Sequence, residues 1–194
     1  MKPRTLLLFL ASLTLIGGMA RATTEEAEKH LQTAVNEVIT AADHTSSSSA
    51  LETTVRPILE KNISFDAMTR HAVGPGWRQF TQEQQKEAIH LFTTLIIRTY
   101  ISKFTPGEHP IITFKAASTP APGRVEVPTT LLYKGSHYDV TYRLENTGGW
   151  YITDVVIEGV SLIANYRTQF DAQFKEGGAI SVIRSLTRSV DEKR

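Results

Sequence analysis

The sequence of 194 residues contains no cysteine, so neither a disulfide nor a thiolate metal ligand can stabilise the fold. Its six histidines form no HExxH pair and no short cluster with carboxylates at the spacing that metal ligands require. A phosphate-binding glycine loop is also missing, because Gly74-Pro75-Gly76 does not follow a predicted strand. These absences predict a domain with an ordinary apolar core and with neither a metal nor a cofactor.

Long apolar runs are absent too, except near the N-terminus. Residues 6–16 are largely apolar, follow two basic residues and precede the cleavage pattern Ala20-Arg21-Ala22. This run is shorter than the roughly 20 residues that span a bilayer. We therefore expect residues 1–22 to be a cleavable signal peptide, and residues 23–194 to form a single exported domain in the periplasm.

A strong excess of either charge is missing as well. The chain has 21 basic and 20 acidic residues, and removal of the predicted signal peptide leaves a net charge of about −2. Because nucleic-acid binding needs a concentrated basic surface, we do not expect a nucleic acid as the partner.

The first half of the chain has the apolar spacing of helices. Ser49-Ala50-Leu51-Glu52 and Thr81-Gln82-Glu83-Gln84 match the capping box that begins a helix, and Pro57 indicates a kink or a new start. We expect helices throughout residues 23–104, namely over residues 23–42, from the first capping box, over residues 65–73, and from the second capping box to about Phe104.

After residue 104 the apolar pattern becomes alternating, which is typical of strands. Pro128 lies inside one of these segments and indicates an edge position or a bulge. Gly177-Gly178 divides the apolar positions that follow the strands into two helices. Helices followed by an antiparallel meander predict an α+β domain, with strands over residues 111–117, 124–133, 137–144 and 150–158, a sheet over residues 111–158, and helices over residues 161–190.

One serine could be read as a nucleophile. Gly159-Val160-Ser161 follows a strand and precedes a helix, as a hydrolase nucleophile does, but Ile163 stands where the GxSxG pattern requires glycine. We therefore expect Ser161 to cap the following helix.

One pair of carboxylates could supply a general base. Asp154 and Glu158 fall on the same face of the last predicted strand, and a buried acid in an apolar pocket can act as a base. The alternation of the strand favours the simpler interpretation, in which both carboxylates point to solvent, opposite Tyr151, Val155 and Ile157.

Three motifs resemble those of a known family. They are Gly74-x-x-Trp77-Arg78-x-x-Thr81-x-Glu83-Gln84, Arg98-Thr99-Tyr100, and Trp150-x-x-x-Asp154-Val155-x-x-Glu158-Gly159-Val160-Ser161. Over nearly all of the predicted mature region, the chain is similar to the MlaC family, the periplasmic phospholipid-binding component of the Mla lipid-asymmetry system. The same family is also known as the toluene-tolerance auxiliary proteins.

The resemblance implies a fold and a task. The fold is a curved four-stranded antiparallel sheet, like that of nuclear-transport-factor cones, wrapped by N- and C-terminal helices around a deep apolar cavity. The task is to carry phospholipid, without catalysis, between an outer-membrane lipoprotein complex and an inner-membrane ABC transporter with a ring of MCE domains. This transport maintains the lipid asymmetry of the outer membrane.

Under this resemblance, the lipid tails are expected between the long helix and the sheet. The same side chains also suit a filled core, because core and pocket positions share one periodicity. The headgroup could lie near Arg98 or Arg143, although either could equally be a solvated surface charge. The expected lipid-binding residues are Phe92, Leu95, Ile96, Tyr100, Phe104, Val140, Tyr142, Val155, Ile157, Val160, Ile163 and Tyr166.

Two other functions stay open from the sequence. An enzyme on the same scaffold would need Asp154, Tyr100 or Tyr142 to converge in the cavity with a shifted pKa. A binding protein for small apolar molecules, such as aromatic solvents, would need a smaller cavity than two acyl chains require.

Overall fold

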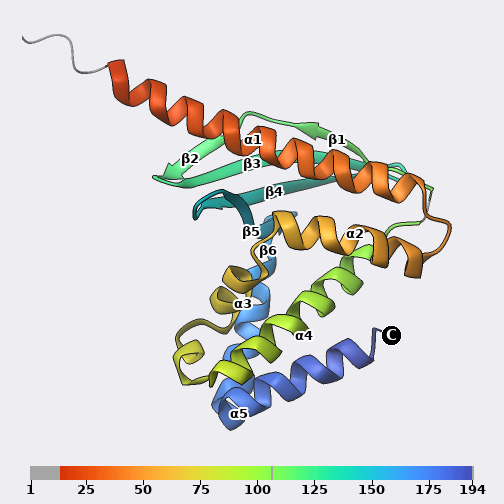
Figure 1. The fold of residues 1–194 in the computed structure, drawn as a ribbon, viewed down its shortest axis with the longest axis vertical. Helices are drawn as coiled ribbons and strands as arrows, with labels where there is room; N and C mark the ends of the chain where they lie inside the picture. The colour runs from red at the N-terminus through yellow and green to blue at the C-terminus, as the bar shows by residue number, and fades with distance from the viewer. Residues whose placement is uncertain (1–13, 106, 194) are drawn as a thin grey trace, which may run out of the picture.

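The computed structural model describes residues 14–105 and 107–193, with side chains from Thr23 onward. Helix α1 lies along the sheet, and the helices α3 to α5 form a second group beyond β5 and β6 (Figure 1). The helices are α1 Thr14–Asp43, α2 Ser48–Asn62, α3 Phe65–Val73, the 3-10 helix η1 Gly74–Gln79, α4 Gln82–Ile101 and α5 Leu162–Asp191. The strands are β1 Ile111–Phe114, β2 Ser118–Ala121, β3 Arg124–Tyr133, β4 Ser136–Asn146, β5 Trp150–Ile157 and β6 Val160–Ser161.

The predicted signal peptide lies largely outside the described residues. Helix α1 begins at Thr14, so its backbone runs through the predicted cleavage pattern at residues 20–22, and residues 1–13 are not described. The division of the chain at residue 22 therefore stays a prediction. Within the described ranges, no helix is both long enough and apolar enough to cross a membrane.

The capping box predicted for the long helix is confirmed. The Thr81 hydroxyl accepts a hydrogen bond from the Gln84 amide at 3.2 Å, and the Gln84 side chain accepts one from the Thr81 amide at 2.9 Å. The helix ends at Ile101 rather than at Phe104. The reason is a change to tighter bonding, since the amides of Lys103 and Phe104 bond to carbonyls only three residues back.

The predicted start of the second helix was wrong by a short distance. Ser47, and not Ser49, caps α2, and its hydroxyl accepts a hydrogen bond from the Ala50 amide at 3.2 Å. Several consecutive serines offer equivalent hydroxyls here, so the pattern alone could not choose among them. The helix then continues through Pro57 to Asn62 as one element.

Both predicted glycine breaks are confirmed. Gly74 has φ +68° at the start of η1, and Gly177 and Gly178 have non-helical backbone angles inside α5. A side chain at Gly76 would place its Cβ 2.9 Å from the Phe174 ring, so this glycine lets η1 approach α5 closely.

The sheet is antiparallel and open, with the strand order β1-β3-β4-β5-β6 and β2 beside β3. The prediction of four strands was wrong, because the described sheet has six. The four expected strands are present, and the two additional ones, β2 and β6, span four and two residues. The two residues of β6 are too few to show alternation, and β2 contains Pro120 and no large apolar side chain, so neither has the pattern of a strand.

Pro128 lies in the middle of β3. One side of β3 pairs with β4, and at Pro128 the partner on the other side changes from β1 to β2. The Lys115 amide, just past the end of β1, donates to the Pro128 carbonyl at 2.9 Å. Because the nitrogen and the carbonyl of one strand residue point the same way, the Pro128 nitrogen faces the Lys115 carbonyl. Proline has no amide hydrogen, so the reciprocal bond to the Lys115 carbonyl cannot form, and β1 ends one residue earlier, at Phe114.

A β-bulge at Thr153 changes which side chains share a face of the sheet. Arg143 is paired with Asp154, but Leu144 is paired with Ile152, so Thr153 is an extra residue in β5. Tyr151 consequently pairs with Glu145, on the face of the charged residues. The prediction that Tyr151 shares a face with Val155 was wrong for this reason.

We call the two faces of the sheet inner and outer. The inner face carries Val127, Tyr142 and Val155 and packs against α1. The outer face carries cross-strand ion pairs between Arg143 and Glu126 and between Arg124 and Glu145. The sheet is therefore apolar on the inner face and charged on the outer face.

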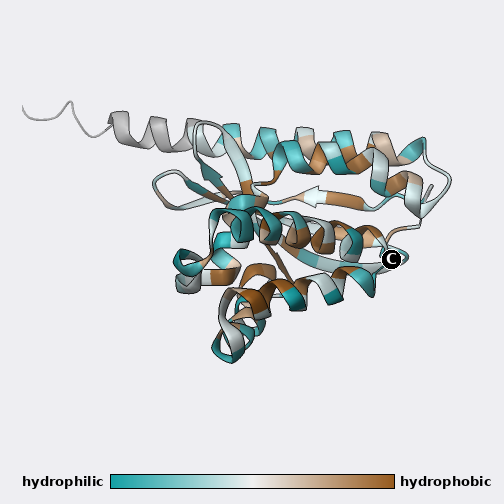
Figure 2. Cartoon of the chain, turned by 60° about the horizontal axis from the view of Figure 1, so that its bottom comes forward, coloured by the Kyte–Doolittle hydropathy of each residue, from teal (hydrophilic) through white to brown (hydrophobic). Residues whose placement is uncertain are grey.

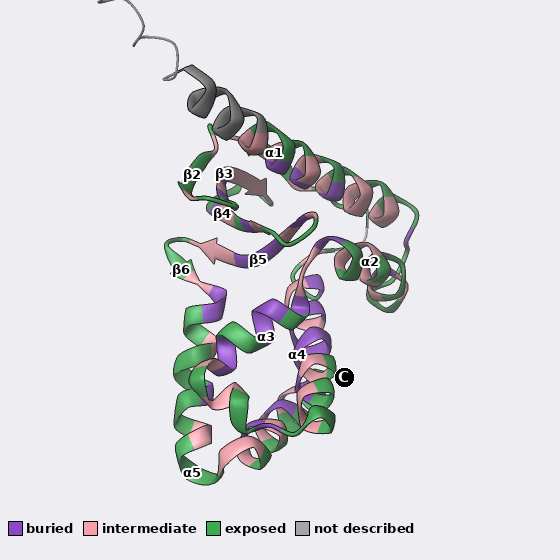
Figure 3. Ribbon diagram, turned by 60° about the vertical axis from the view of Figure 1, so that its left-hand side comes forward, coloured by how far each residue is buried: buried purple, intermediate pink, exposed green. Residues whose placement is uncertain are grey.

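The buried residues form two clusters. The sheet cluster joins Ala27 and Leu31 of α1 to the inner face of the sheet, and the helical cluster surrounds Phe92 among α2 to α5. Buried residues accordingly occur along α3, α4 and β5, whereas most of α5 is exposed (Figure 3). From Thr23 onward, α1 carries both hydrophilic and hydrophobic residues, as expected for a helix with one buried side (Figure 2).

Asp154 joins the sheet to α5. One carboxylate oxygen accepts hydrogen bonds from the amides of Val155 at 2.9 Å and Ile163 at 3.1 Å. The other oxygen accepts from the Ser161 hydroxyl at 2.6 Å and from Arg143 at 3.0 Å. The prediction that Asp154 points to solvent was wrong: the residue is 7% exposed, because β6 and the start of α5 cover this part of the outer face.

We expect Asp154→Ala to lower the free energy of unfolding by about 2–4 kcal/mol, because a buried amide and a hydroxyl lose their acceptor and Arg143 loses a partner. Glu126→Ala is the matched control, since it removes the other, more exposed carboxylate that pairs with Arg143 and should cost about 1 kcal/mol or less. Urea unfolding checks both variants. Equal decreases in the free energy of unfolding of the two variants would contradict the role of Asp154 in connecting the sheet to α5.

Candidate functional site

The residues predicted to bind lipid divide into packed and accessible groups. Phe92, Leu95, Ile96 and Ile163 are buried in the helical cluster. The Phe92 ring lies edge-on to Tyr166, with centroids 5.0 Å apart. These four side chains have almost no surface to offer a ligand unless the packing changes. Val140 is also buried, on the sheet.

The accessible residues come from both layers. Tyr100, Phe104 and Tyr166 are half-buried against the helical cluster, and Tyr142 and Val155 are half-buried against the sheet cluster. Ile157 is half-buried, and Val160 is 60% exposed.

A row of apolar side chains crosses the inner face beyond the part that α1 covers. Val140 pairs with Ile157, and Ile157 pairs with Val160, so the three share one face across three strands. Tyr138 lies two residues before Val140 on the same strand, pairs with Leu131, and is 39% exposed. This row, Val140, Ile157 and Val160 with Tyr138 and Leu131, is called the open half of the inner face below.

Helix α4 ends near this open half. Its main neighbours are α5, α3 and α2. Just past its end, the Phe104 ring meets the Tyr133 ring, with centroids 5.2 Å apart, and Tyr133 lies on the same face as Leu131. One part of the inner face is therefore covered by α1, and another part lies close to the end of α4.

Three tyrosines give this region its electrostatic character. Burial raises the pKa of Tyr142 to about 12, and burial also raises the pKa of Tyr100 and Tyr166. All three phenols are therefore neutral over the physiological pH range. The region offers apolar surface and neutral hydroxyls rather than charge.

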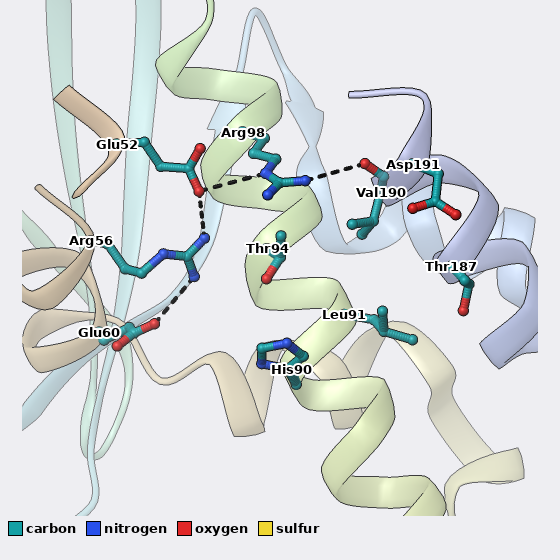
Figure 4. A pocket seen from close by; sticks show the side chains of 10 residues that line it. All are labelled: Glu52, Arg56, Glu60, His90, Leu91, Thr94, Arg98, Thr187, Val190 and Asp191. Carbon is teal, nitrogen blue, oxygen red and sulfur yellow. Dashed lines mark hydrogen bonds and ion pairs between the residues drawn. The ribbon is translucent and has the colours of Figure 1, made fainter. Parts of the chain in front are cut away.

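A polar groove lies elsewhere, between α2, α4 and the end of α5 (Figure 4). It measures about 580 Å³, and its charged residues pair with one another. Glu52 binds Arg56 at 2.7 Å and Arg98 at 3.5 Å, and Arg98 also donates to the Val190 carbonyl at 3.4 Å. These bonds fasten the end of α5 to α4 and α2.

Both arginines considered for headgroup binding are thus engaged in the fold. Arg98 belongs to the groove network, and Arg143 binds Glu126 and Asp154 on the outer face. Neither lies on the inner face of the sheet.

The geometry gives little support to catalysis. The carboxylate of Asp154 is occupied by four hydrogen bonds, and Ser161 caps α5 by accepting from the Ala164 amide at 3.0 Å. Neither residue hydrogen-bonds a histidine within the described part of the chain. Among the residues with described side chains, no three histidines or acids come together as a metal site would need.

Comparison with known proteins gives the family. A family model described as "MlaC protein" matches residues 29–188. The chain belongs to the MlaC family. A solved structure of a phospholipid-binding protein from Ralstonia solanacearum, in complex with a phospholipid, resembles this MlaC-family chain with a TM-score of 0.80 and 25% sequence identity. The similarity covers 87% of this chain and 98% of the other. No curated protein matches the chain.

Two residues of the open half were not among the lipid-binding residues expected from the sequence of this MlaC-family chain. These residues are Leu131 and Tyr138. Tyr138 could have been found from the sequence, because it alternates in phase with Val140 and Tyr142. Leu131 was harder to assign, because Pro128 interrupts the pattern of its strand.

The buried phenol of Tyr142 should be visible in an alkaline titration. Because its folded pKa of about 12 lies above the unfolded value near 10, the stability it contributes is complete below pH 10 and is lost as the pH rises toward 12. Tyrosinate absorbance should show one phenol fewer near pH 12 in Tyr142→Phe, and this variant should lose less stability between pH 10 and 12. If the wild type and Tyr142→Phe instead differ by a phenol that titrates near pH 10, Tyr142 is not buried.

Proposed function

We propose that this protein binds phospholipid and carries it through the periplasm. The observation that carries the proposal is the similarity, across nearly the whole of the other chain, to a phospholipid-binding protein solved with its ligand. The open half of the inner face agrees with it, because Val160, which is 60% exposed, shares this face with Ile157 and with Tyr138, which is 39% exposed, and the row offers apolar surface to a ligand.

The acyl tails are proposed to lie between the open half of the inner face and the end of α4. Tyr100, Phe104 and Tyr166 would contact them from the helical side, and Tyr142, Val155 and the open half from the sheet side. The packed residues Phe92, Leu95, Ile96 and Ile163 would then support the wall of the site. Tails in this position would cover the apolar surface that α1 leaves accessible.

A carrier of this kind has a clear physical reason. Each methylene contributes about 0.8 kcal/mol when it leaves water, so a phospholipid with roughly thirty of them scarcely exists as a free monomer. A protein that moves phospholipid through an aqueous compartment must therefore enclose the tails. Binding and release suffice for this task, and no bond in the lipid changes.

The route follows from the family. We propose that residues 1–22 direct export, that residues 23–194 form the mature domain, and that the lipid passes between an outer-membrane lipoprotein complex and an inner-membrane ABC transporter with MCE domains. This transport would maintain the lipid asymmetry of the outer membrane. The pairing of charges on the outer face suits a protein that stays in solution between two membranes.

Native mass spectrometry of the protein, purified from cells without detergent, tests the proposal. A stoichiometric phospholipid, identified after organic extraction, is the expected result. A protein that is empty and also takes up no phospholipid from vesicles would overturn it. Co-purification of a small aromatic molecule instead would favour a binder of small apolar compounds.

We expect Val160→Glu to reduce the bound phospholipid by about tenfold or more, because it places a charge beside the tails while Val160 is exposed enough for the fold to tolerate it. Ile180→Glu is the matched control, since Ile180 is also 60% exposed but lies on α5 after the Gly178 break. Lipid content per folded protein is measured by the same mass spectrometry. Normal loading of folded Val160→Glu would argue against this placement of the tails.

A further inference from the structure

Three tyrosines that pack on the two buried clusters have hydroxyls without a hydrogen-bond partner within the described part of the chain. They belong to Tyr100, Tyr142 and Tyr166. The Tyr133 hydroxyl, by contrast, accepts from the Thr105 amide at 2.8 Å and lies 3.3 Å from Glu108. None of the three unpaired hydroxyls is fully enclosed, because the polar atoms that are buried without a partner lie on other residues. Each of the three therefore reaches accessible space.

That accessible space is confined rather than open solvent. All three side chains are only half-exposed or less, and burial raises the pKa of each phenol, most of all that of Tyr142. Tyr166 packs on the rings of Phe92 and Phe170, with centroids 5.0 and 5.8 Å away. The hydroxyls are thus polar groups at the edge of an apolar interior.

The three hydroxyls come from both sides of the region proposed to hold the tails. Tyr166 of α5 lies close enough to Tyr100 of α4 to raise the pKa of its phenol, and both side chains pack on the helical cluster. Tyr142 lies on the inner face of the sheet, in register with Val127 and Val155. The helical side therefore offers two donors and the sheet side one.

A further hydroxyl is unsatisfied beside them. The Thr99 oxygen is buried without a hydrogen bond of good geometry, and it neighbours the Tyr166 hydroxyl. A small rotation would let Thr99 donate to the Tyr166 oxygen, which would leave the phenol proton of Tyr166 available to a ligand. Buried polar groups without a partner are costly, so a ligand acceptor at this place would be favourable.

The chemistry of these groups selects among the parts of a phospholipid. Neutral phenols in apolar surroundings are poorly suited to a charged phosphate, whose burial would be costly. They match an uncharged acceptor that is joined directly to hydrocarbon, and the carbonyl oxygen of an acyl ester is such an acceptor. Alkyl chains joined by ether oxygens carry no carbonyl.

We propose that Tyr100, Tyr142 and Tyr166 donate hydrogen bonds to the acyl-ester carbonyls of the bound lipid, so that the protein prefers ester-linked to ether-linked phospholipids. The inference rests on the proposed function and adds a specificity to the same site. The proposal also gives a role to Tyr100 in the motif Arg98-Thr99-Tyr100, in which the fold explains only Arg98.

A competition experiment tests this preference. Full-length protein, stripped of lipid, is incubated with vesicles that contain equal amounts of diacyl phosphatidylglycerol and its dialkyl-ether analogue of the same chain lengths, and the bound lipids are compared by native mass spectrometry. At about threefold to tenfold for each hydrogen bond, we expect at least a fivefold preference for the diacyl lipid. The triple variant Y100F/Y142F/Y166F should bind both lipids nearly equally.

Two controls keep the hydroxyl effect apart from packing. Tyr151→Phe removes a hydroxyl from the outer face, and Tyr133→Phe removes one that is already bonded, so both should retain the preference. Each single variant at Tyr100, Tyr142 and Tyr166 keeps the ring and should lower the preference in part, which preserves the test if the triple variant does not fold.

The outcomes separate the inference from the function on which it rests. Equal binding of the two lipids by the wild type would overturn the inference while supporting phospholipid binding. A preference that survives in the folded triple variant would also overturn it. A wild type that binds neither lipid would overturn the proposed function itself.

Discussion

The inner face of the sheet has more apolar surface than α1 covers, and much of the structure depends on this mismatch. An antiparallel sheet with one apolar face needs a second layer, and α1 provides it over Val127, Leu144 and Ile152. Beyond these residues, Ile157 and Val160 keep part of their surface accessible, although α4 ends nearby. A helix packed directly on that half would have given a more stable domain without a place for a ligand.

The two clusters of buried residues are connected at a small number of backbone sites. Ile63, at the end of α2, forms an isolated bridge to Ile152, and the Ser64 amide donates to the Ile152 carbonyl at 3.0 Å. The second connection is Asp154, which binds the start of α5 through Ser161 and Ile163. Both lie at β5, next to the bulge, so this strand holds the helical layer to the sheet, together with the end of α1, where Val38, Ala41 and Ala42 pack on the helical cluster.

Local signals in the sequence predicted the helices and strands well. They predicted less well which side chains lie on which face of the sheet. Thr81 and Ser161 were identified as caps because capping depends on a few neighbouring residues, and β1, β3, β4 and β5 followed from their alternation. The bulge at Thr153 was not predicted, and with it the burial of Asp154 and the orientation of Tyr151 were missed. Periodicity also could not separate packed Phe92 from accessible Tyr100, since both lie on one apolar side of α4 and only the neighbouring layer decides their exposure.

The bulge also has a meaning for sequence comparison. Trp150 and Asp154 are four residues apart, a spacing that puts two side chains on the same face of a regular strand, yet Trp150 packs in the sheet cluster and Asp154 lies on the outer face. The extra residue reconciles the spacing with the two orientations. A relative with only two residues between this tryptophan and aspartate could keep both orientations on a regular strand. Chain length and bulge should therefore vary together among homologues, and a one-residue gap in an alignment here would mark a change in strand curvature rather than an error.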